Sequence, residues 1–110
     1  MAYDEDLADR IRELVATERG LTEQRMFGGL AFLINGHLSV AASGQGGLML
    51  RVDPERTDEL VARDGVRRMV MRGREMDGWL RVDTGVLGTD DELHQWVAQG
   101  VGYARSLPPK

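Results

Sequence analysis

The chain has 110 residues, of which 42% are hydrophobic, and this is the size of one compact domain with a single core. The formal net charge of -4 and the isoelectric point near 5.1 argue against a protein that coats nucleic acid or an anionic membrane, since such proteins neutralise phosphates with Lys and Arg. The absence of cysteine excludes disulfides, thiolate nucleophiles and cysteine-ligated zinc. The acidic N-terminus is unlike a secretory signal, and no apolar run approaches the roughly 20 residues of a membrane span, so we expect a cytoplasmic protein with no membrane partner.

The first half of the chain has the pattern of one helix followed by several strands. Apolar residues recur at helical spacing over 4–18 and predict the first helix: Leu7, Ile11, Leu14 and Val15. Strand-like runs follow over 22–27, 30–34, 37–42 and 48–52. The Asn35-Gly36 pair predicts a type I′ hairpin turn between the second and third runs, because both residues tolerate positive φ.

The second half predicts two more helices around two strands. Asp53 and Pro54 have the pattern of a helix N-cap and first helical residue. Strands are expected over 66–72 and 79–83, joined by a connection with a turn at Asp77-Gly78. A capping-box pattern, Thr89-Asp90-Asp91-Glu92, starts a last helix whose apolar face is expected to hold Leu93, Trp96, Val97, Gly100, Val101 and Ala104. The order α, three or four β, α, two β, α predicts one α+β domain over 1–110, with an antiparallel-rich sheet and helices on one face.

Few residues have a pattern that indicates chemistry. The loop Gly44-Gln45-Gly46-Gly47 lacks the Lys-Ser/Thr ending of a phosphate loop and precedes a strand, which favours a flexible turn. His37 and His94 have no Ser or Cys at a spacing that suggests a nucleophile and its base. Asp90 lies four residues before His94, but two ligands without a third do not make a metal site. We therefore expect no catalytic residues, no metal and no cofactor.

The most basic segment, residues 63–74, has two open interpretations. It carries five arginines against the single acid Asp64: Arg63, Arg67, Arg68, Arg72 and Arg74. Such a patch could contact nucleic-acid phosphates. Alternatively it is a solvated strand face, offset by acidic residues nearby in the sequence: Asp58, Glu59, Glu75 and Asp77.

Alternation along the strands predicts which side chains face the helices. One face of the Asn35-Gly36 hairpin is wholly apolar and is expected to meet the helices: Ala31, Leu33, Leu38, Val40 and Ala42. The other face is expected to carry Phe32 and Ile34, joined by Met49, Val70 and Trp79. Their strand neighbours are expected to point outward and form a basic edge: Arg51, Arg68, Arg72 and Arg81. An apolar patch with a basic edge is a candidate surface for a partner or a second copy of the chain. The alternative is that Trp79 lies over arginine stems and covers its own edge.

Four segments of the sequence, in order, resemble the N-terminal domain of the TfoX/Sxy family. They are "RMFGG" before the Asn-Gly hairpin, "LMLRVDPE", "GREMDGWLRVD" and "YARSLP". The resemblance implies an α+β fold similar to secretion chaperones and a role like that of competence regulators, whose longer members add a C-terminal helical domain. It implies no catalytic residue set. In the first segment, Met26 and Phe27 are expected to anchor the first strand, while Gly28 and Gly29 let it bulge or turn.

Three hypotheses of function follow. The leading one is a cytoplasmic, non-enzymatic regulatory or protein-interaction module of the TfoX N-terminal type, which forms a homodimer through its outer sheet surface or binds another protein there. The second is a nucleic-acid-associated factor that uses the segment from Arg63 to Arg74. The third is a small enzyme built around His37 or His94.

Overall fold

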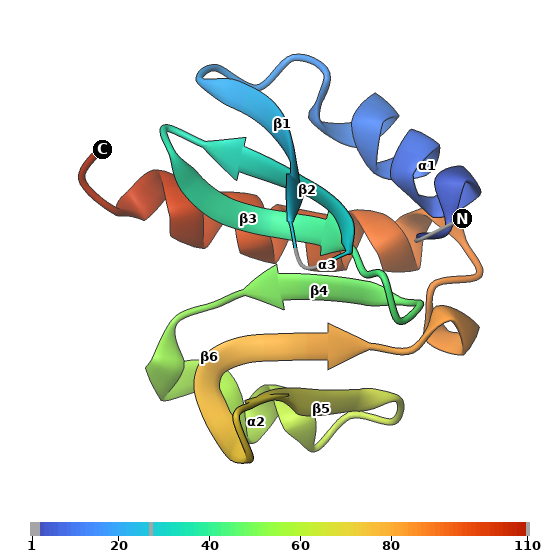
Figure 1. The fold of residues 1–110 in the computed structure, drawn as a ribbon, viewed down its shortest axis with the longest axis vertical. Helices are drawn as coiled ribbons and strands as arrows, with labels where there is room; N and C mark the ends of the chain where they lie inside the picture. The colour runs from blue at the N-terminus through green and yellow to red at the C-terminus, as the bar shows by residue number, and fades with distance from the viewer. Residues whose placement is uncertain (1–2, 27, 110) are drawn as a thin grey trace.

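The computed structural model describes residues 3–26 and 28–109 of the chain. Within them, one six-stranded antiparallel sheet, in the order β1-β2-β3-β4-β6-β5, packs against three α-helices (Figure 1). The elements in chain order are α1 (Glu5–Val15), β1 (Leu21–Met26), β2 (Gly29–Ile34), β3 (His37–Ala42), β4 (Leu48–Arg51), α2 (Thr57–Val61), β5 (Val66–Met71), β6 (Arg74–Val82) and α3 (Asp90–Ser106). The short 3-10 turns η1 (Pro54–Arg56) and η2 (Thr84–Val86) precede α2 and α3. This architecture confirms the predicted α+β class and the predicted order of elements.

The main core lies between the sheet and the helices. It combines apolar side chains of α1, α2 and α3 with one face of the strands, and its fully buried large members include Ile11, Phe32, Ile34, Leu50, Leu60, Leu80 and Leu93. The long helix α3 lies behind β3 in Figure 1 and packs on both β3 and β4. It approaches β3 closely at Gly100, where a Cβ atom would lie 2.5 Å from the Ser39 carbonyl oxygen. Only glycine fits this contact without moving α3 or β3.

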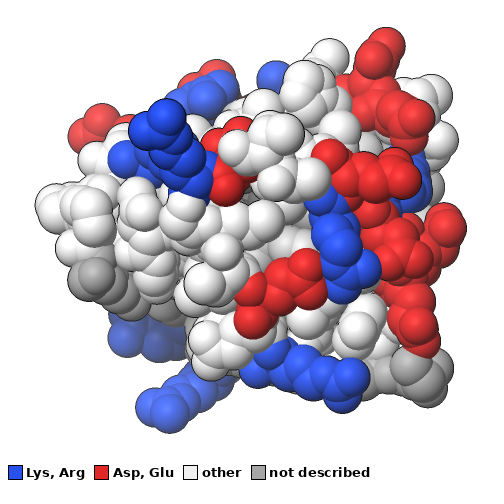
Figure 2. Space-filling model, turned by 90° about the horizontal axis from the view of Figure 1, so that it is seen from above, with Lys and Arg blue, Asp and Glu red and all other residues white. Residues whose placement is uncertain are grey.

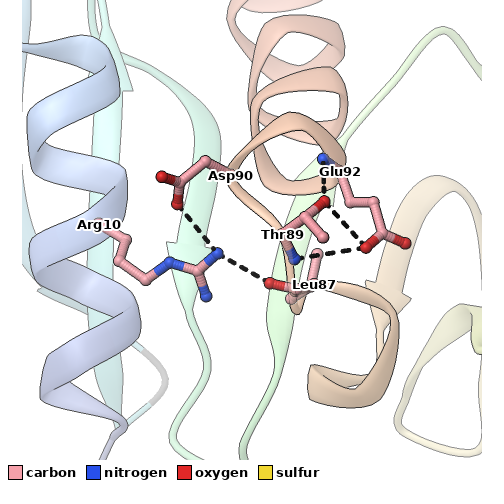
Figure 3. Close-up of polar contacts among 5 residues, drawn as sticks. All are labelled: Arg10, Leu87, Thr89, Asp90 and Glu92. Carbon is pink, nitrogen blue, oxygen red and sulfur yellow. Dashed lines mark hydrogen bonds and ion pairs between the residues drawn. The ribbon is translucent and has the colours of Figure 1, made fainter.

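Local capping explains where the two long helices begin. Asp4 is the N-cap of α1, and its Oδ1 accepts a hydrogen bond from Leu7 N at 3.1 Å. At α3 the predicted capping box is present: Thr89 Oγ1 accepts from Glu92 N at 3.1 Å, and Glu92 Oε1 accepts from Thr89 N at 3.3 Å (Figure 3).

Arginines tie α1 to its neighbours. Arg10 donates to the Leu87 carbonyl at 2.9 Å and lies 3.5 Å from the carboxylate of Asp90, which links α1 to the start of α3 (Figure 3). Arg12 donates to both carboxylate oxygens of Glu23 on β1, at 2.7 and 3.0 Å. This hydrogen-bonded pairing with Arg12 lowers the pKa of the Glu23 carboxyl, because it favours the ionised form.

A bulge in β3 changes which side chains of the β2–β3 hairpin share a face of the sheet. Phe32 pairs with Val40 and Leu33 with Leu38, so Ser39 is an extra residue on β3. The buried Ser39 hydroxyl donates to the Phe32 carbonyl at 2.6 Å and satisfies the interrupted ladder. Phe32 and Ile34 on β2 face the helices in the main core, so the prediction that put them on the outer face is wrong.

The bulge also redistributes the apolar face that was expected to meet the helices. Val40 and Ala42 do face the main core, together with Phe32 and Ile34. The other three predicted members lie on the opposite side of the sheet, in a second cluster with Ala41: Ala31, Leu33 and Leu38. Because the period of a strand is two residues, one extra residue moves the following side chains to the other face.

The β5–β6 turn lies at Arg72-Gly73, five residues before the predicted turn at Asp77-Gly78. Arg72 and Gly73 both have positive φ, 53° and 77°, and β6 starts at Arg74. Gly78 also has positive φ, at 83°, but it lies within β6, where its N–H donates to Thr57 Oγ1 at 2.8 Å and its carbonyl accepts from Val52 N at 2.8 Å. The Asp77-Gly78 pair is thus a distortion inside a strand that docks β6 on η1 and α2, and the prediction of a turn there is wrong.

The Gly28-Gly29 pair is a close contact between backbones. Gly28 has a φ of 75°, and a Cβ on Gly29 would overlap the Ala42 carbonyl oxygen on β3. This confirms that the pair shapes the β1–β2 connection. Met26 ends β1 and packs, partly buried, against the outer side of the sheet. Phe27 lies outside the described residues, and its predicted anchoring role stays a prediction.

Candidate functional site

The outer side of the sheet carries a second apolar cluster, which we call the outer cluster. Its buried members are Ala31, Leu33, Leu38, Ala41, Met49 and Met69. Met26, Met71 and Trp79 pack against it and are partly buried. The side of the sheet away from the helices is therefore largely closed by its own side chains, and among the described large hydrophobic residues Val70 alone is exposed, at 59%. In place of the broad exposed apolar patch expected there, the described residues leave only the exposed Val70 and the partly buried Met26, Met71 and Trp79.

The six residues predicted to form one interaction surface separate into different environments. Phe32 and Ile34 are fully buried in the main core. Arg68 donates to Asp77 Oδ1 at 2.9 Å and is ion-paired with Asp58, so its charge is balanced within the domain. The remaining three lie in the β5–β6 ribbon: Arg72 in its turn, and Trp79 and Arg81 on β6.

Trp79 belongs to a group that links the sheet to α3. Arg51, the last residue of β4, pairs with Trp79 across the β4–β6 ladder. The Arg51 guanidinium carbon lies 5.2 Å from the centre of the Trp79 ring and 5.6 Å from that of Tyr103 on α3. Both distances are within the range of cation–π attraction. We call these three residues the arginine–aromatic cluster.

A cleft opens beside this cluster. It has a volume of about 270 Å³ and lies between α3 and the connection from β4 to η1, lined by Val52, Asp53, Arg56, Ala98, Gln99, Gly102 and Tyr103. Its acidic and basic groups already have partners: Asp53 Oδ1 accepts from Glu55 N at 2.9 Å, and Arg56 donates to Glu59 at 3.1 Å. Tyr103 lines the cleft and also contacts Arg51, so the two features form one site.

Sequence reasoning missed Arg51 and Tyr103 as members of a site. Arg51 was expected only to point outward, and Tyr103 was quoted only as part of the family resemblance. Their meeting depends on β4 pairing with β6 and on α3 crossing behind the sheet, neither of which is encoded locally. The strand alternation of Arg51 and Trp79 is a usable signal only once the β4–β6 register is known.

Arg81 has a structural role at the other end of β4. It donates to Gln45 Oε1 at 2.9 Å and to the Gly46 carbonyl at 3.1 Å, which holds the glycine-rich β3–β4 loop against β6. Partial burial lowers the pKa of Arg81, and the charge of Arg67 on the neighbouring strand adds to this effect. The loop forms a turn, as its sequence predicted, with positive φ at Gly46 and Gly47.

Most of the basic segment is engaged within the domain. Arg63 lies over the Trp96 ring at 5.3 Å, and Arg67 donates to Asp83 at 2.6 Å. Arg68 is ion-paired with two acids, Asp58 and Asp77. Of the five arginines, only Arg72 and Arg74 have neither an ion pair nor a contact with an aromatic ring among the described residues. The segment is therefore not a continuous free cationic stripe.

Acidic side chains gather elsewhere, on the side of the molecule where α1 lies (Figure 2). Four acids in α1 contribute to them: Glu5, Asp6, Asp9 and Glu13. The arginine–aromatic cluster belongs to β4, β6 and the C-terminal half of α3. The chain has a net negative charge, but its charged side chains are distributed unevenly over the surface.

The two histidines lie apart from each other. His37 is partly buried at the start of β3, beside the hairpin turn, and its Nε2 donates to the Pro108 carbonyl at 2.6 Å. His94 is exposed on α3 and lines a groove with Glu18 and Arg105, which are ion-paired at 2.7 Å. Within residues 3–26 and 28–109, no group of three or more His, Asp or Glu side chains could hold a metal ion. In that same part of the chain, no helix is long and apolar enough to cross a membrane.

In the comparison with known families, the chain matches the TfoX N-terminal domain over residues 13–104. The match spans α1 from its last turn to α3, and it includes both the outer cluster and the arginine–aromatic cluster. Searches of curated proteins and of solved structures find no match.

Proposed function

Because the chain belongs to the TfoX N-terminal domain family, we propose that it is a protein-interaction module with a regulatory role and no catalytic activity of its own. The observation that carries the proposal is the arginine–aromatic cluster. Arg51 is held by two aromatic rings at the surface, beside a cleft, without a carboxylate among the described residues to balance its charge. Arginine, tryptophan and tyrosine are the side chains that contribute most to protein interfaces.

The hydrogen bonds of the potential nucleophiles and bases favour a structural role for these side chains over a catalytic one. The Ser39 hydroxyl is buried and donates to the Phe32 carbonyl, and His37 donates to the Pro108 carbonyl. Thr57 Oγ1 accepts from Gly78 N and donates to the Pro54 carbonyl. A nucleophile and its base must be within hydrogen-bond reach of each other. The side chains of Ser39, His37 and Thr57 are instead hydrogen-bonded to backbone groups.

A role in nucleic-acid binding is the weaker alternative. It requires several arginines free to neutralise phosphates, whereas Arg67 and Arg68 are paired with acids and Arg63 is stacked on Trp96. Titration of the protein with duplex DNA at increasing salt concentration tests it. We expect no measurable binding at physiological salt, and tight binding that weakens steeply with salt would favour the alternative.

Capture experiments with matched variants test the main proposal. We compare the wild type, Arg51→Gln and Arg74→Gln as baits, since both variants lose one positive charge but Arg74 is exposed and lies outside the cluster. A partner that is retained by wild type and Arg74→Gln and lost by Arg51→Gln is the expected result. If the two variants retain the same proteins, the cluster is not the interaction site and the proposal fails.

We also propose that the chain self-associates, through the free edge of β5 rather than through the outer face. β5 is the last strand in the sheet order and carries the exposed Val70. An uncovered edge strand presents unpaired backbone groups to another strand. Pairing of β5 with a second β5 about a two-fold axis brings Arg67 and Arg68 near their copies, and their ion pairs with acids of the same chain offset the repulsion.

Light scattering over a range of protein concentrations tests this arrangement. The wild type should dimerise, and Val70→Lys should be monomeric because it places a charge in the new ladder. Gln24→Lys is the matched control, since Gln24 is exposed on β1, the opposite edge strand. A monomeric wild type, or equal loss of dimer in both variants, would show that β5 is not the contact.

A further inference from the structure

The Arg51 guanidinium has hydrogen-bonding capacity that the domain does not use. Its contacts are with the Trp79 and Tyr103 rings, and within the described residues it makes neither an ion pair nor a hydrogen bond. An aromatic ring attracts the positive charge but is a poor acceptor, so the five N–H donors remain available. Six other arginines, by contrast, have a carboxylate partner: Arg10, Arg12, Arg56, Arg67, Arg68 and Arg105.

The position of Arg51 favours binding of an anion. Its side chain is half-buried, and the two rings restrict where the guanidinium lies. A donor group held in place before binding loses less conformational entropy when a ligand arrives. Partial burial also strengthens a charge-assisted hydrogen bond compared with one in open solvent.

The adjoining cleft restricts what the anion can be attached to. At about 270 Å³ it is smaller than the usual range for cofactor sites, and it is suited to one aliphatic side chain. Its walls include the apolar surfaces of Val52 and Ala98. A ligand group in this cleft contacts Tyr103, whose ring centre lies 5.6 Å from the Arg51 guanidinium carbon.

The charges around the cleft favour a carboxylate over a phosphate. A guanidinium binds either group through two parallel hydrogen bonds. Asp53 also lines the cleft, however, and the other cation there, Arg56, is already paired with Glu59. A dianionic phosphate is repelled by Asp53 more strongly than a singly charged carboxylate.

We propose that the arginine–aromatic cluster and its cleft bind an acidic peptide segment of a partner protein, in which an Asp or Glu lies next to an aliphatic residue. The carboxylate accepts hydrogen bonds from Arg51, and the aliphatic side chain occupies the cleft between α3 and η1. This assignment rests on the proposed role as a protein-interaction module and names the chemistry that the module recognises.

The test uses the full chain, labelled with ¹⁵N, and a short capped peptide with two glutamates flanked by leucines. Titration should produce saturable shifts of the Arg51 side-chain Nε–H signal and of backbone signals around Tyr103. The same peptide with glutamine in place of glutamate should bind about tenfold more weakly or worse, since it loses a charge-assisted hydrogen bond. Equal binding of the two peptides would overturn the proposal.

Two substitutions test whether binding needs the guanidinium group of Arg51 or only a positive charge. Arg51→Lys keeps the charge but loses the planar fork, and it should weaken binding of the glutamate peptide by about tenfold or more. Arg74→Lys should leave the affinity unchanged. Equal effects of the Arg51 and Arg74 substitutions would overturn the assignment.

Inorganic phosphate is the competing probe. We expect phosphate to displace the glutamate peptide only through its contribution to ionic strength, as sodium chloride does. If phosphate displaces it specifically at Arg51, the site recognises phosphate and the carboxylate assignment is wrong. A peptide that fails to bind, while partner capture still depends on Arg51, would reject this ligand class and leave the protein-interaction role in place.

Discussion

Two glycines of α3, two residues apart, should respond to alanine with opposite changes in stability. Alanine is about 0.8–1.0 kcal/mol more favourable than glycine inside a helix, and this gain applies at both positions. At Gly102 an added Cβ meets nothing within 4 Å. Gly102→Ala should therefore raise the free energy of unfolding by up to about 1 kcal/mol.

At Gly100 the same gain is outweighed by the contact with β3. An added Cβ would lie 2.5 Å from the Ser39 carbonyl oxygen and 2.7 Å from Val40 Cγ1. A backbone oxygen in a sheet cannot rotate away as a flexible side chain can, so either α3 or β3 must shift. Overpacking of this kind costs about 1–3 kcal/mol, which makes Gly100→Ala less stable than Gly102→Ala by that amount.

Urea unfolding followed by far-ultraviolet circular dichroism measures both effects. The slope of the free energy against urea should be equal in the two variants and the wild type, because the area exposed on unfolding is the same. The midpoint should rise for Gly102→Ala and fall for Gly100→Ala. Equal stabilisation by the two substitutions would refute the close packing of α3 on β3.

Three further predictions test the register and the charge pairs. Phe32→Ala should cost about 3–5 kcal/mol in unfolding free energy because Phe32 is fully buried, whereas Val70→Ala at an exposed site should cost less than about 1 kcal/mol; similar values in urea unfolding would contradict the placement of Phe32 in the main core. Ser39→Ala should cost about 1–3 kcal/mol, because it leaves the buried Phe32 carbonyl without its partner, and a neutral result by the same measurement would remove this role of the hydroxyl. The pKa of Glu23 is lowered by Arg12, so the stabilisation it supplies is fully present above its ordinary pKa of 4.5 and is lost as the pH falls through the folded value. Wild type should exceed Glu23→Gln in stability by at most about 1 kcal/mol at pH 7, since the pair is partly exposed, and thermal unfolding should show a smaller difference at pH 3 than at pH 7.

The family and the element order could be predicted from the sequence because their signals are local. Asp4 and the apolar spacing after it specify α1, and Thr89 with Glu92 specifies the start of α3, since a cap and its helix are within a few residues of each other. The same holds for Asn35, which takes a φ of 53° in the predicted hairpin turn.

The faces of the strands and the candidate site were decided by the tertiary structure. Val40 and Ala42 join Phe32 in the main core because Ser39 is accommodated as an extra residue in β3, and alternation alone does not reveal an inserted residue. Arg51 meets Trp79 and Tyr103 only because β4 pairs with a strand that is not its neighbour in the sequence and α3 returns behind both. Local patterns determine which elements form, whereas contacts between residues distant in the sequence depend on how those elements pack, and packing is a property of the whole chain.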